Sequence, residues 1–375
     1  MQRRLINVLH LGVKELWSLL REPTMLGLIA YTFSFAIYVA ATAQPDTLSR
    51  AAIAIVDEDQ SPLSARITSA FYPPQFSPPH IITLAETDPV LDAGRFTFVL
   101  DIPPDFQRDV LAGRVPELQL NVDATRMSQA FSGSGYIQQI ALAEVTEFLA
   151  HTRDEAPPAV DLVMRMRFNP ALDHTWFGSV MELVNNVTML SIILTGAALI
   201  REREHGTIEH LLVMPVTPLE IMLAKLWSMG LVVWLATVAS LTLVVQGALQ
   251  VPIEGAIGLF LAGVALHLFA TTSMAIFMAT LARNMPQFAL LVLLILLPME
   301  LLSGANTPRE SMPWAVQTLM LLAPTTHFVE LSQAILYRGA GLSVVWPPFL
   351  WLTGIGGLLF AASLRRFRRA IGQMA

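Results

Sequence analysis

The sequence predicts an α-helical polytopic membrane protein with six transmembrane helices and an inserted α/β domain between the first and second spans. Apolar residues make up 54% of the 375 residues and charged residues only 14%, which is unlike an ordinary soluble protein. Several uncharged runs have the length of a membrane span. By contrast, residues 44–173 have the composition of a soluble domain.

Residues 1–24 are predicted to form an interfacial helix on the cytoplasmic leaflet. Its apolar stripe is Leu5, Leu9, Val13, Leu16 and Leu20, with Arg3, Arg4, Lys14 and Arg21 around it. Residues 25–43 are uncharged, and at about 1.5 Å per residue they extend roughly 28 Å, enough to cross the hydrocarbon core. Ala41-Thr42-Ala43 also resembles a signal-peptidase site, but the long preceding segment and the full span length favour a retained span.

Residues 44–173 are predicted to form an α/β domain large enough to bury its own core. Strands are predicted at residues 50–56, 81–84, 95–100, 117–122 and 162–168. Between them, Asp88-Pro89 is a helix start, residues 104–112 form a helix stopped by Gly113, and a longer helix covers residues 129–150.

The remaining spans are predicted at residues 176–200, 226–245, 256–281, 287–302 and 346–364. Residues 313–322 are apolar but too short to cross, which indicates a re-entrant or interfacial helix within the external segment 303–345.

The distribution of basic residues predicts the orientation, because six spans place both termini on one side. Twelve basic residues lie on that side, and the short loops opposite hold only Arg309 and Arg338. The twelve are Arg3, Arg4, Lys14, Arg21, Arg201, Arg203, Lys225, Arg283, Arg365, Arg366, Arg368 and Arg369. The basic side is therefore predicted to be cytoplasmic, and the inserted domain periplasmic.

A charged segment at residues 201–225 separates the second and third spans. From Thr207 onward, Ile208, Leu211, Leu212 and Pro215 follow the spacing of an amphipathic helix. Thr217-Pro218-Leu219-Glu220 then forms a capping box with proline at the first helical position, which predicts a new helix start. Such a short surface helix suits a cytoplasmic partner that moves the membrane helices, although a solvated connector is the alternative.

The same segment resembles the coupling segment of ABC-2-type (type V) ATP-binding-cassette permeases. The matching positions are Arg201, Glu202, Arg203, Glu204, Gly206, Thr207, Glu209, Leu211, Pro215, Glu220 and Lys225. Further resemblance covers residues 56–64, 102–106, 111–114, 168–170 and 302–304, with Pro308, Met312-Pro313 and Pro324, so it extends over essentially the whole chain. Ala305 departs from the family pattern, which often has phenylalanine at this position.

The resemblance implies a permease subunit of an exporter in the bacterial inner membrane. It implies two permeases, identical or paralogous, and two cytoplasmic ABC ATPase subunits, with a periplasmic adaptor and an outer-membrane channel as further candidate partners. ATPase closure would push the helix at 207–214, and residues 217–225 and 201–204 would carry the motion into the third and second spans. Membrane lipids surround the chain, the external domain would receive or guide substrate, and no nucleic-acid partner is implied.

The sequence contains no motif for catalysis. A Walker A loop needs Gly-Lys-Ser/Thr, but the only lysines are Lys14 and Lys225 and neither follows a glycine. This chain is therefore predicted to be no enzyme and to bind no cofactor, with ATP-Mg on a partner ATPase. His205 and His210 lie about 140° apart on a helix, and there is no cysteine, so no metal site is predicted.

Five polar residues within the predicted spans are candidates for a transport path: Glu182, Asn185, Asn186, His267 and Glu300. The simpler alternatives are that the two glutamates reach outside water and that the asparagines bond between helices. A proton-driven transporter using Glu182, Glu300 or His267, and a non-transporting scaffold that regulates an envelope process, remain alternative functions. An apolar path favours an apolar or amphipathic small compound as substrate.

Overall fold

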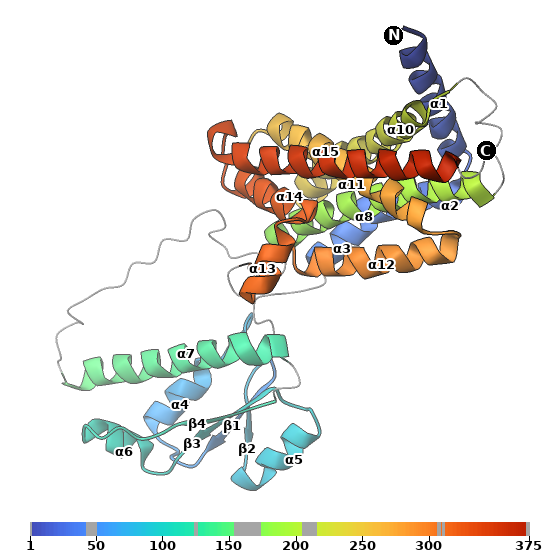
Figure 1. Cartoon of the computed structure of the whole chain (residues 1–375). Helices are drawn as coiled ribbons and strands as arrows, with labels where there is room; N and C mark the ends of the chain where they lie inside the picture. Colours follow the sequence, from blue (N-terminus) through green and yellow to red (C-terminus); the bar gives the residue numbers. More distant parts are fainter. Residues whose placement is uncertain are drawn as a thin grey trace. The chain divides into compact units, whose positions relative to one another are not determined.

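The computed structural model describes residues 2–42, 51–123, 127–153, 174–204, 216–305, 309 and 312–372. The chain divides into two compact units, one formed by residues 1–43 and 175–375 and the other by residues 44–174 (Figure 1). The described part of the first unit is helical, and the second unit combines a sheet with helices.

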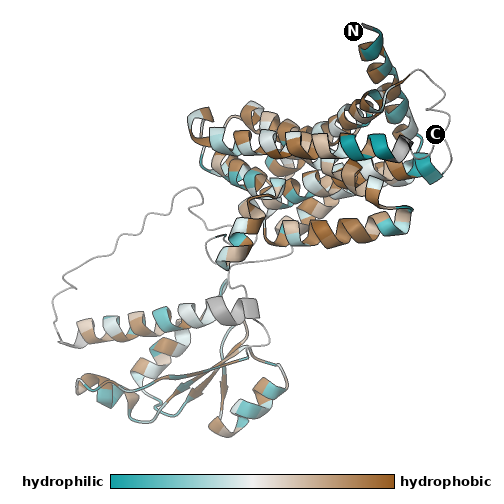
Figure 2. Ribbon diagram, in the orientation of Figure 1, coloured by the Kyte–Doolittle hydropathy of each residue, from teal (hydrophilic) through white to brown (hydrophobic). Residues whose placement is uncertain are grey.

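The described helices of the first unit are α1 (Gln2–Leu20), α2 (Pro23–Tyr31), α3 (Ile37–Thr42), α8 (His174–Glu204), α10 (Pro218–Ala239), α11 (Ile257–Leu281), α12 (Met285–Leu301), α13 (Trp314–Met320), α14 (Pro324–Ser332) and α15 (Leu342–Gly372). Three π-helical segments extend them: η1 (Thr32–Ala36) joins α2 to α3, η3 (Ser240–Ala248) follows α10, and η5 (Gln333–Tyr337) follows α14. Apolar residues predominate along these helices (Figure 2).

Five of these helical stretches are long and apolar enough to cross a membrane: residues 23–42, 175–204, 218–248, 257–281 and 342–369. The bent pair of α13 with α14 and η5, which turns by 88°, is a sixth candidate. The fifth predicted span, α12, has 17 residues and is about 26 Å long, shorter than the roughly 30 Å hydrocarbon core. The helical unit is therefore that of a multi-pass membrane protein with five or six candidate spans.

The helix formed by α14 and η5 was not predicted. Its sequence mixes Thr325, Thr326, His327 and Ser332 with apolar residues, so it lacks the uniform hydropathy of a span. Two of these polar groups bond within the fold: the His327 ring nitrogen lies 2.9 Å from the Leu321 carbonyl oxygen, and the Ser332 hydroxyl donates to the Phe328 carbonyl. This internal pairing allows the segment to be buried.

Helix α8 is the most buried of the candidate spans, with 83% of its most apolar window inside the structure. Its apolar residues face several sides, as expected for a helix with neighbours all round. Small residues allow close approaches elsewhere: a Cβ added to Gly356 on α15 would come within 2.7 Å of the Phe269 ring on α11.

The second unit contains a four-stranded sheet. Its strands are β1 (Ile53–Asp57), β2 (His80–Ile82), β3 (Phe98–Ile102) and β4 (Gln119–Val122), in the order β2-β1-β3-β4. The first three are parallel and β4 is antiparallel to β3. Four predicted strands are confirmed with shifted ends, and the fifth, at residues 162–168, lies outside the described residues.

Helices cover both faces of this sheet. Helices α4 (Pro62–Ser69), α6 (Phe106–Leu111) and α7 (Met127–Arg153) share one apolar core with Ile53, Ile55 and Leu100. The short η2 (Leu84–Glu86) and α5 (Thr87–Asp92) precede β3, and α5 packs through Val90 and Leu91 on the other face. Gly113 follows α6 with φ of +74°, which explains why the helix stops there.

Candidate functional site

The end of α8 contains the sequence Arg201-Glu202-Arg203-Glu204, which is the described part of the predicted coupling segment. Successive residues on an α-helix point about 100° apart, so four in a row reach every side of the helix. Each of the four side chains contacts a different neighbouring part of the chain. This end of α8 lies at the same end of the helical unit as α1 (Figure 1).

Glu202 belongs to a buried cluster of two cations and two anions, which we call the ionic cluster: Lys14, Glu15, Glu202 and Lys225. The Lys225 Nζ lies 2.7 Å from Glu202 Oε2 and 3.1 Å from Glu15 Oε1. The Lys14 Nζ lies 2.7 Å from Glu202 Oε1 and 3.3 Å from Glu15 Oε1. The cluster thereby joins α1, α8 and α10.

Burial separates the two lysines of the ionic cluster. The Lys225 side chain is 2% exposed, Glu15 8% and Glu202 11%, but Lys14 is 50% exposed. Burial raises the pKa of Glu15, and the nearby charge of Lys225 opposes that rise. Burial lowers the pKa of Lys14, but its hydrogen bond and charge interaction with Glu202 raise it more. The charge of Lys225 is thus the largest interaction that opposes the effect of burial on the Glu15 carboxylate.

Arg203 and Glu204 connect α8 to the turn between α11 and α12. The Arg203 Nη2 donates to the carbonyl oxygens of Ala279 and Ala282 at 2.5 and 2.6 Å, at the C-terminal end of α11. Glu204 Oε1 accepts from the backbone N–H of Met285, 2.8 Å away, at the start of α12. A cation at a helix C-terminus and an anion at a helix N-terminus both interact favourably with the helix dipoles. Arg201 pairs with Glu22, just before α2.

Helix α1 packs on α10 through a face that differs from its apolar stripe. Gly12 leaves room for the Trp227 ring, whose Nε1 donates to the Val8 carbonyl oxygen at 3.2 Å, and Glu15 and Leu19 are buried. The predicted stripe points away from the bundle instead: Leu5, Leu9, Val13 and Leu20 are all between 45% and 64% exposed. Apolar side chains therefore remain free for a surface outside the chain.

The capping box predicted at the start of α10 is confirmed. The Thr217 hydroxyl accepts from the Glu220 N–H at 3.4 Å, and Glu220 Oε2 accepts from the Thr217 N–H at 2.6 Å. Glu220 is 3% exposed, so its carboxylate acts within the cap. The remaining residues assigned to the coupling segment, Gly206, Thr207, Ile208, Glu209, Leu211 and Pro215, lie outside the described residues.

The polar residues within the helices fall into two groups. His267 is fully buried: its Nε2 lies 2.8 Å from the Thr188 hydroxyl, and its ring stacks on Phe328 with centroids 4.0 Å apart. Asn186 donates to the Thr32 carbonyl oxygen at 3.0 Å, at the start of the π-helical segment η1. Both contacts link neighbouring helices, in line with the simpler interpretation of intramembrane polar residues.

The second group consists of two carboxylates. Glu182 and Glu300 are half-buried and close enough for their charges to repel one another. Glu182 also hydrogen-bonds Asn186, one turn along α8, and Asn185 is half-buried beside it. The structure therefore brings Glu182, Asn186 and Glu300 into one region and places His267 in a separate helix contact.

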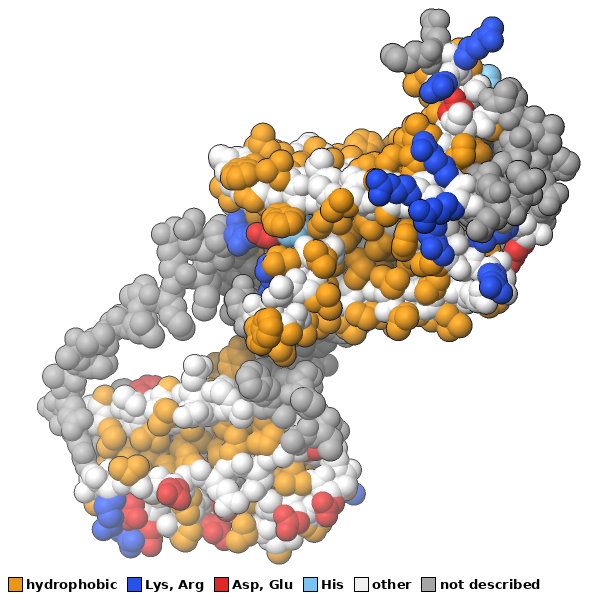
Figure 3. Space-filling view, in the orientation of Figure 1, with side chains coloured by type: hydrophobic (Ala, Val, Ile, Leu, Met, Phe, Trp, Pro, Cys, Tyr) orange, Lys and Arg blue, Asp and Glu red, His pale blue; other side chains and the backbone are white. Residues whose placement is uncertain are grey.

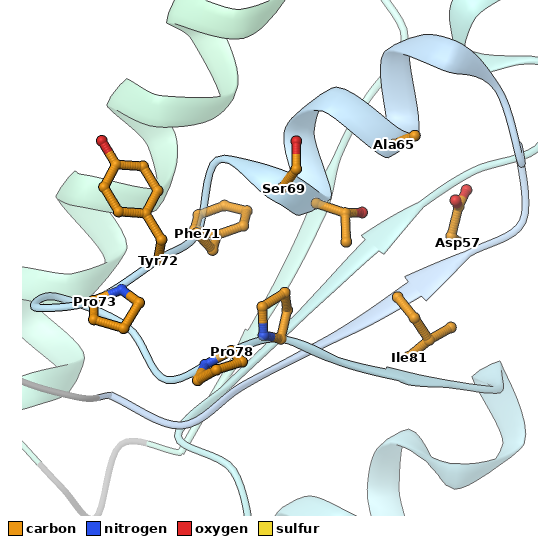
Figure 4. A pocket seen from close by; sticks show the side chains of 10 residues that line it. Asp57, Ala65, Ser69, Phe71, Tyr72, Pro73, Pro78 and Ile81 are labelled. Atoms are coloured by element: carbon orange, nitrogen blue, oxygen red, sulfur yellow. The ribbon is translucent and has the colours of Figure 1, made fainter.

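The second unit, which we call the soluble unit after the composition of residues 44–173, contains a small hollow between α4 and the chain leading into β2. It has a volume of about 430 Å³, with Ala65 and Ser69 on one side and Tyr72 and Pro78 on the other (Figure 4). Asp57 lies at its edge, where its carboxylate accepts hydrogen bonds from the Gln60 N–H and the Ser64 hydroxyl. These bonds use the Asp57 carboxylate in the turn after β1, so the hollow presents little chemistry of its own.

Comparison with known proteins gives the family. Residues 24–365 match the family described as ABC-2 family transporter protein. The chain belongs to the ABC-2 family. It is 62% identical over 373 residues to the inner membrane transport permease YhhJ of Escherichia coli K12, covering 100% of both chains. It is also 29% identical over 365 residues to the probable multidrug ABC transporter permease YbhR of the same organism, covering 96% of this chain and 97% of YbhR.

Membership of the ABC-2 family makes this chain a membrane component of an ABC transporter. In this family the ATPase activity belongs to a separate subunit. Glu15, Glu22 and Trp227 were not predicted as site residues. One signal for a missing partner was present: Lys225 lies inside an apolar helix, where a charge requires a counter-charge.

Proposed function

We propose that this chain is the permease subunit of an ATP-driven exporter in the inner membrane. Both termini and the ionic cluster would face the cytoplasm, and the soluble unit would lie in the periplasm. This orientation is supported by the basic side chains gathered at one end of the helical unit, where Figure 3 shows those of α1 and α15. The exposed apolar stripe of α1 would then rest on the cytoplasmic leaflet.

The observation that carries the proposal is the set of contacts made by Arg201–Glu204. Lys225 joins the end of α8 to the start of α10, and Glu15 joins both to α1. Arg203 and Glu204 continue the connection to α11 and α12. A push on the segment between Glu204 and Thr217 would therefore reach five helices through short polar contacts.

The drive would come from cytoplasmic ATPase subunits that bind ATP-Mg and contact the segment containing Ile208 and Glu209. Two permeases, identical or paralogous, would enclose the path, and an apolar or amphipathic compound would leave through it. A periplasmic adaptor and an outer-membrane channel are compatible further partners. Glu182 and Glu300 would lie along this path, since their charges occupy one region of the helical unit.

Cysteine crosslinking tests this proposal directly, because the chain has no cysteine of its own. An Ile208→Cys variant in native membranes should capture a nucleotide-binding subunit, and the yield should change with ATP. A Trp314→Cys variant is the control: this side chain is 80% exposed on α13 and should capture no ATPase. Efficient labelling of position 208 without ATPase capture would favour a proton-driven transporter or a scaffold instead.

A further inference from the structure

The soluble unit contains a second and larger hollow beneath α7, which we call the α7 pocket. Its volume is about 800 Å³, and apolar side chains of α6, β4 and α7 line it, among them Phe106, Val110, Leu118, Leu120, Leu142 and Val145. Figure 3 shows hydrophobic side chains gathered in a hollow on this face of the unit. None of these residues contributes to the contacts at the end of α8.

The pocket exists because α7 covers the β4 side of the sheet incompletely. Leu120 and Val122 on β4, and Leu118 just before it, occupy alternate positions and belong to the apolar core under α7, yet all are only partly buried. Around the opening, Leu142 is 59% exposed and Val115 is 93% exposed. Contiguous exposed apolar surface of this kind is typical of a binding site.

Its shape favours a small molecule over a flat protein surface. Small-ligand pockets typically measure about 300–1,000 Å³, and the α7 pocket falls in that range. Leu100, Phe106 and Ile137 form its floor, and each is no more than 3% exposed. The hollow is therefore concave and closed below, with its opening between α7 and the chain that follows α6.

The lining chemistry favours an uncharged ligand. Among the described residues of the lining, Arg114 is the only charged one, and its Nη2 lies 2.5 Å from Asp109 Oδ1. The hydrogen bond from Arg114 lowers the pKa of Asp109, so the pair remains ionised and its charges cancel near neutral pH. Ser134 and Gln138 on α7 supply the polar groups of the wall. The lining thus complements an apolar body that carries one or two hydrogen-bonding groups.

We propose that the α7 pocket binds a small, uncharged, largely apolar compound. That this compound is also the transported substrate rests on the proposed export function. Binding of a compound in the α7 pocket does not rest on the export function, so the binding proposal and the export proposal can be refuted separately.

Cysteine protection in the full-length chain in lipid nanodiscs tests the site. The variants Leu142→Cys and Ala143→Cys place a thiol on adjacent exposed positions of α7, and only Leu142 lines the pocket. Each is labelled with a water-soluble maleimide at increasing free concentrations of N-phenyl-1-naphthylamine, an uncharged aromatic probe. At a probe concentration of twice its dissociation constant, labelling at position 142 should slow about threefold, in proportion to the unoccupied fraction, while position 143 keeps its rate.

A third variant tests whether protection comes from the pocket. Gln138→Trp, made in the Leu142→Cys background, fills the opening from an exposed helical position and should weaken the protection. Unchanged labelling at position 142 would overturn the proposal, as would equal slowing at both positions. A thiol at 142 that is blocked before any probe is added would overturn it too, because the pocket would then hold another chain segment or a partner. Protection at 142 without ATPase capture at 208 would leave the binding site standing and refute ATP-driven export.

Discussion

Replacing Lys225 by methionine should be among the most damaging single changes at the end of α8. The substitution keeps most of the length of the unbranched side chain and removes its charge. Glu202 and Glu15 then lose contacts of 2.7 and 3.1 Å to the Nζ, while their side chains remain 11% and 8% exposed. Water cannot replace the missing cation at that degree of burial.

The expected cost follows from the burial of the group. Removing one partner of a buried ion pair typically costs about 3–5 kcal/mol, because the remaining charge is left uncompensated. Lys14 still contacts both carboxylates, so we expect a value near the lower limit. Lys14→Met is the matched control: it removes a cation from the same carboxylates, but Lys14 is 50% exposed, and such pairs contribute only about 0–1 kcal/mol.

The assay is thermal denaturation of the purified variants in nanodiscs, compared by rank because a membrane protein need not unfold in a two-state transition. Lys225→Met should melt well below Lys14→Met. Adding Glu202→Gln to Lys225→Met should recover part of the loss, since it removes one uncompensated charge, and the double-mutant cycle should show coupling. Equal and small shifts for both lysine variants would refute the argument that burial sets the strength of this cluster.

Two further changes test other contacts. Gly12→Leu should displace α1 from α10 and lower the melting temperature, at a cost of about 1–3 kcal/mol, because an added Cβ would lie 2.1 Å from the Trp227 ring. Gly27→Leu is the control and should be near neutral, because a Cβ added there would have nothing within 4 Å. Equal shifts in melting temperature for the two variants would contradict this packing. In the soluble unit, hydrogen bonds from the Thr83 N–H and hydroxyl lower the pKa of Glu86 from its usual 4.5. The ionised Glu86 carboxylate therefore stabilises the folded unit above pH 4.5, and this stabilisation is lost as the pH falls below that value. Glu86→Ala should therefore speed hydrogen exchange at the Thr83 amide at neutral pH and have little effect in acid. If the variant and the wild type differed in exchange rate by the same factor at both pH values, the hydrogen bonds from Thr83 to Glu86 would be excluded as the cause.

Local sequence patterns were sufficient to predict those features that depend on residues close together along the chain. The capping box at Thr217 and Glu220 was predicted from four residues and is present. The helix end at Gly113 and four strands of the soluble unit were predicted in the same way. Each depends on residues within a few positions of one another, so propensity and spacing carry the information.

Pairing between distant segments could not be predicted. Glu15 meets Lys225 only because α1 packs on α10, and nothing along the chain relates two residues that far apart. The predicted apolar stripe of α1 lies mostly on its exposed side, but no prediction was made for the face that packs against the protein, which contains Gly12 and Glu15. In a membrane, an apolar face gains little by turning toward other helices, so small and charged residues can define the packed face instead.

The alternation of charge at the end of α8 has a physical consequence for motion. Arg201 and Arg203 reach Glu22 and the end of α11, while Glu202 and Glu204 reach Lys225 and the start of α12. A rotation or shift of this helix end would break several polar contacts at once, and at least Glu202 is too buried for water to replace them. Moving the neighbouring helices together preserves those contacts and costs less. We therefore expect the ends of α1, α8, α10, α11 and α12 to move as one body, so a force applied between Glu204 and Thr217 would displace these five helix ends together.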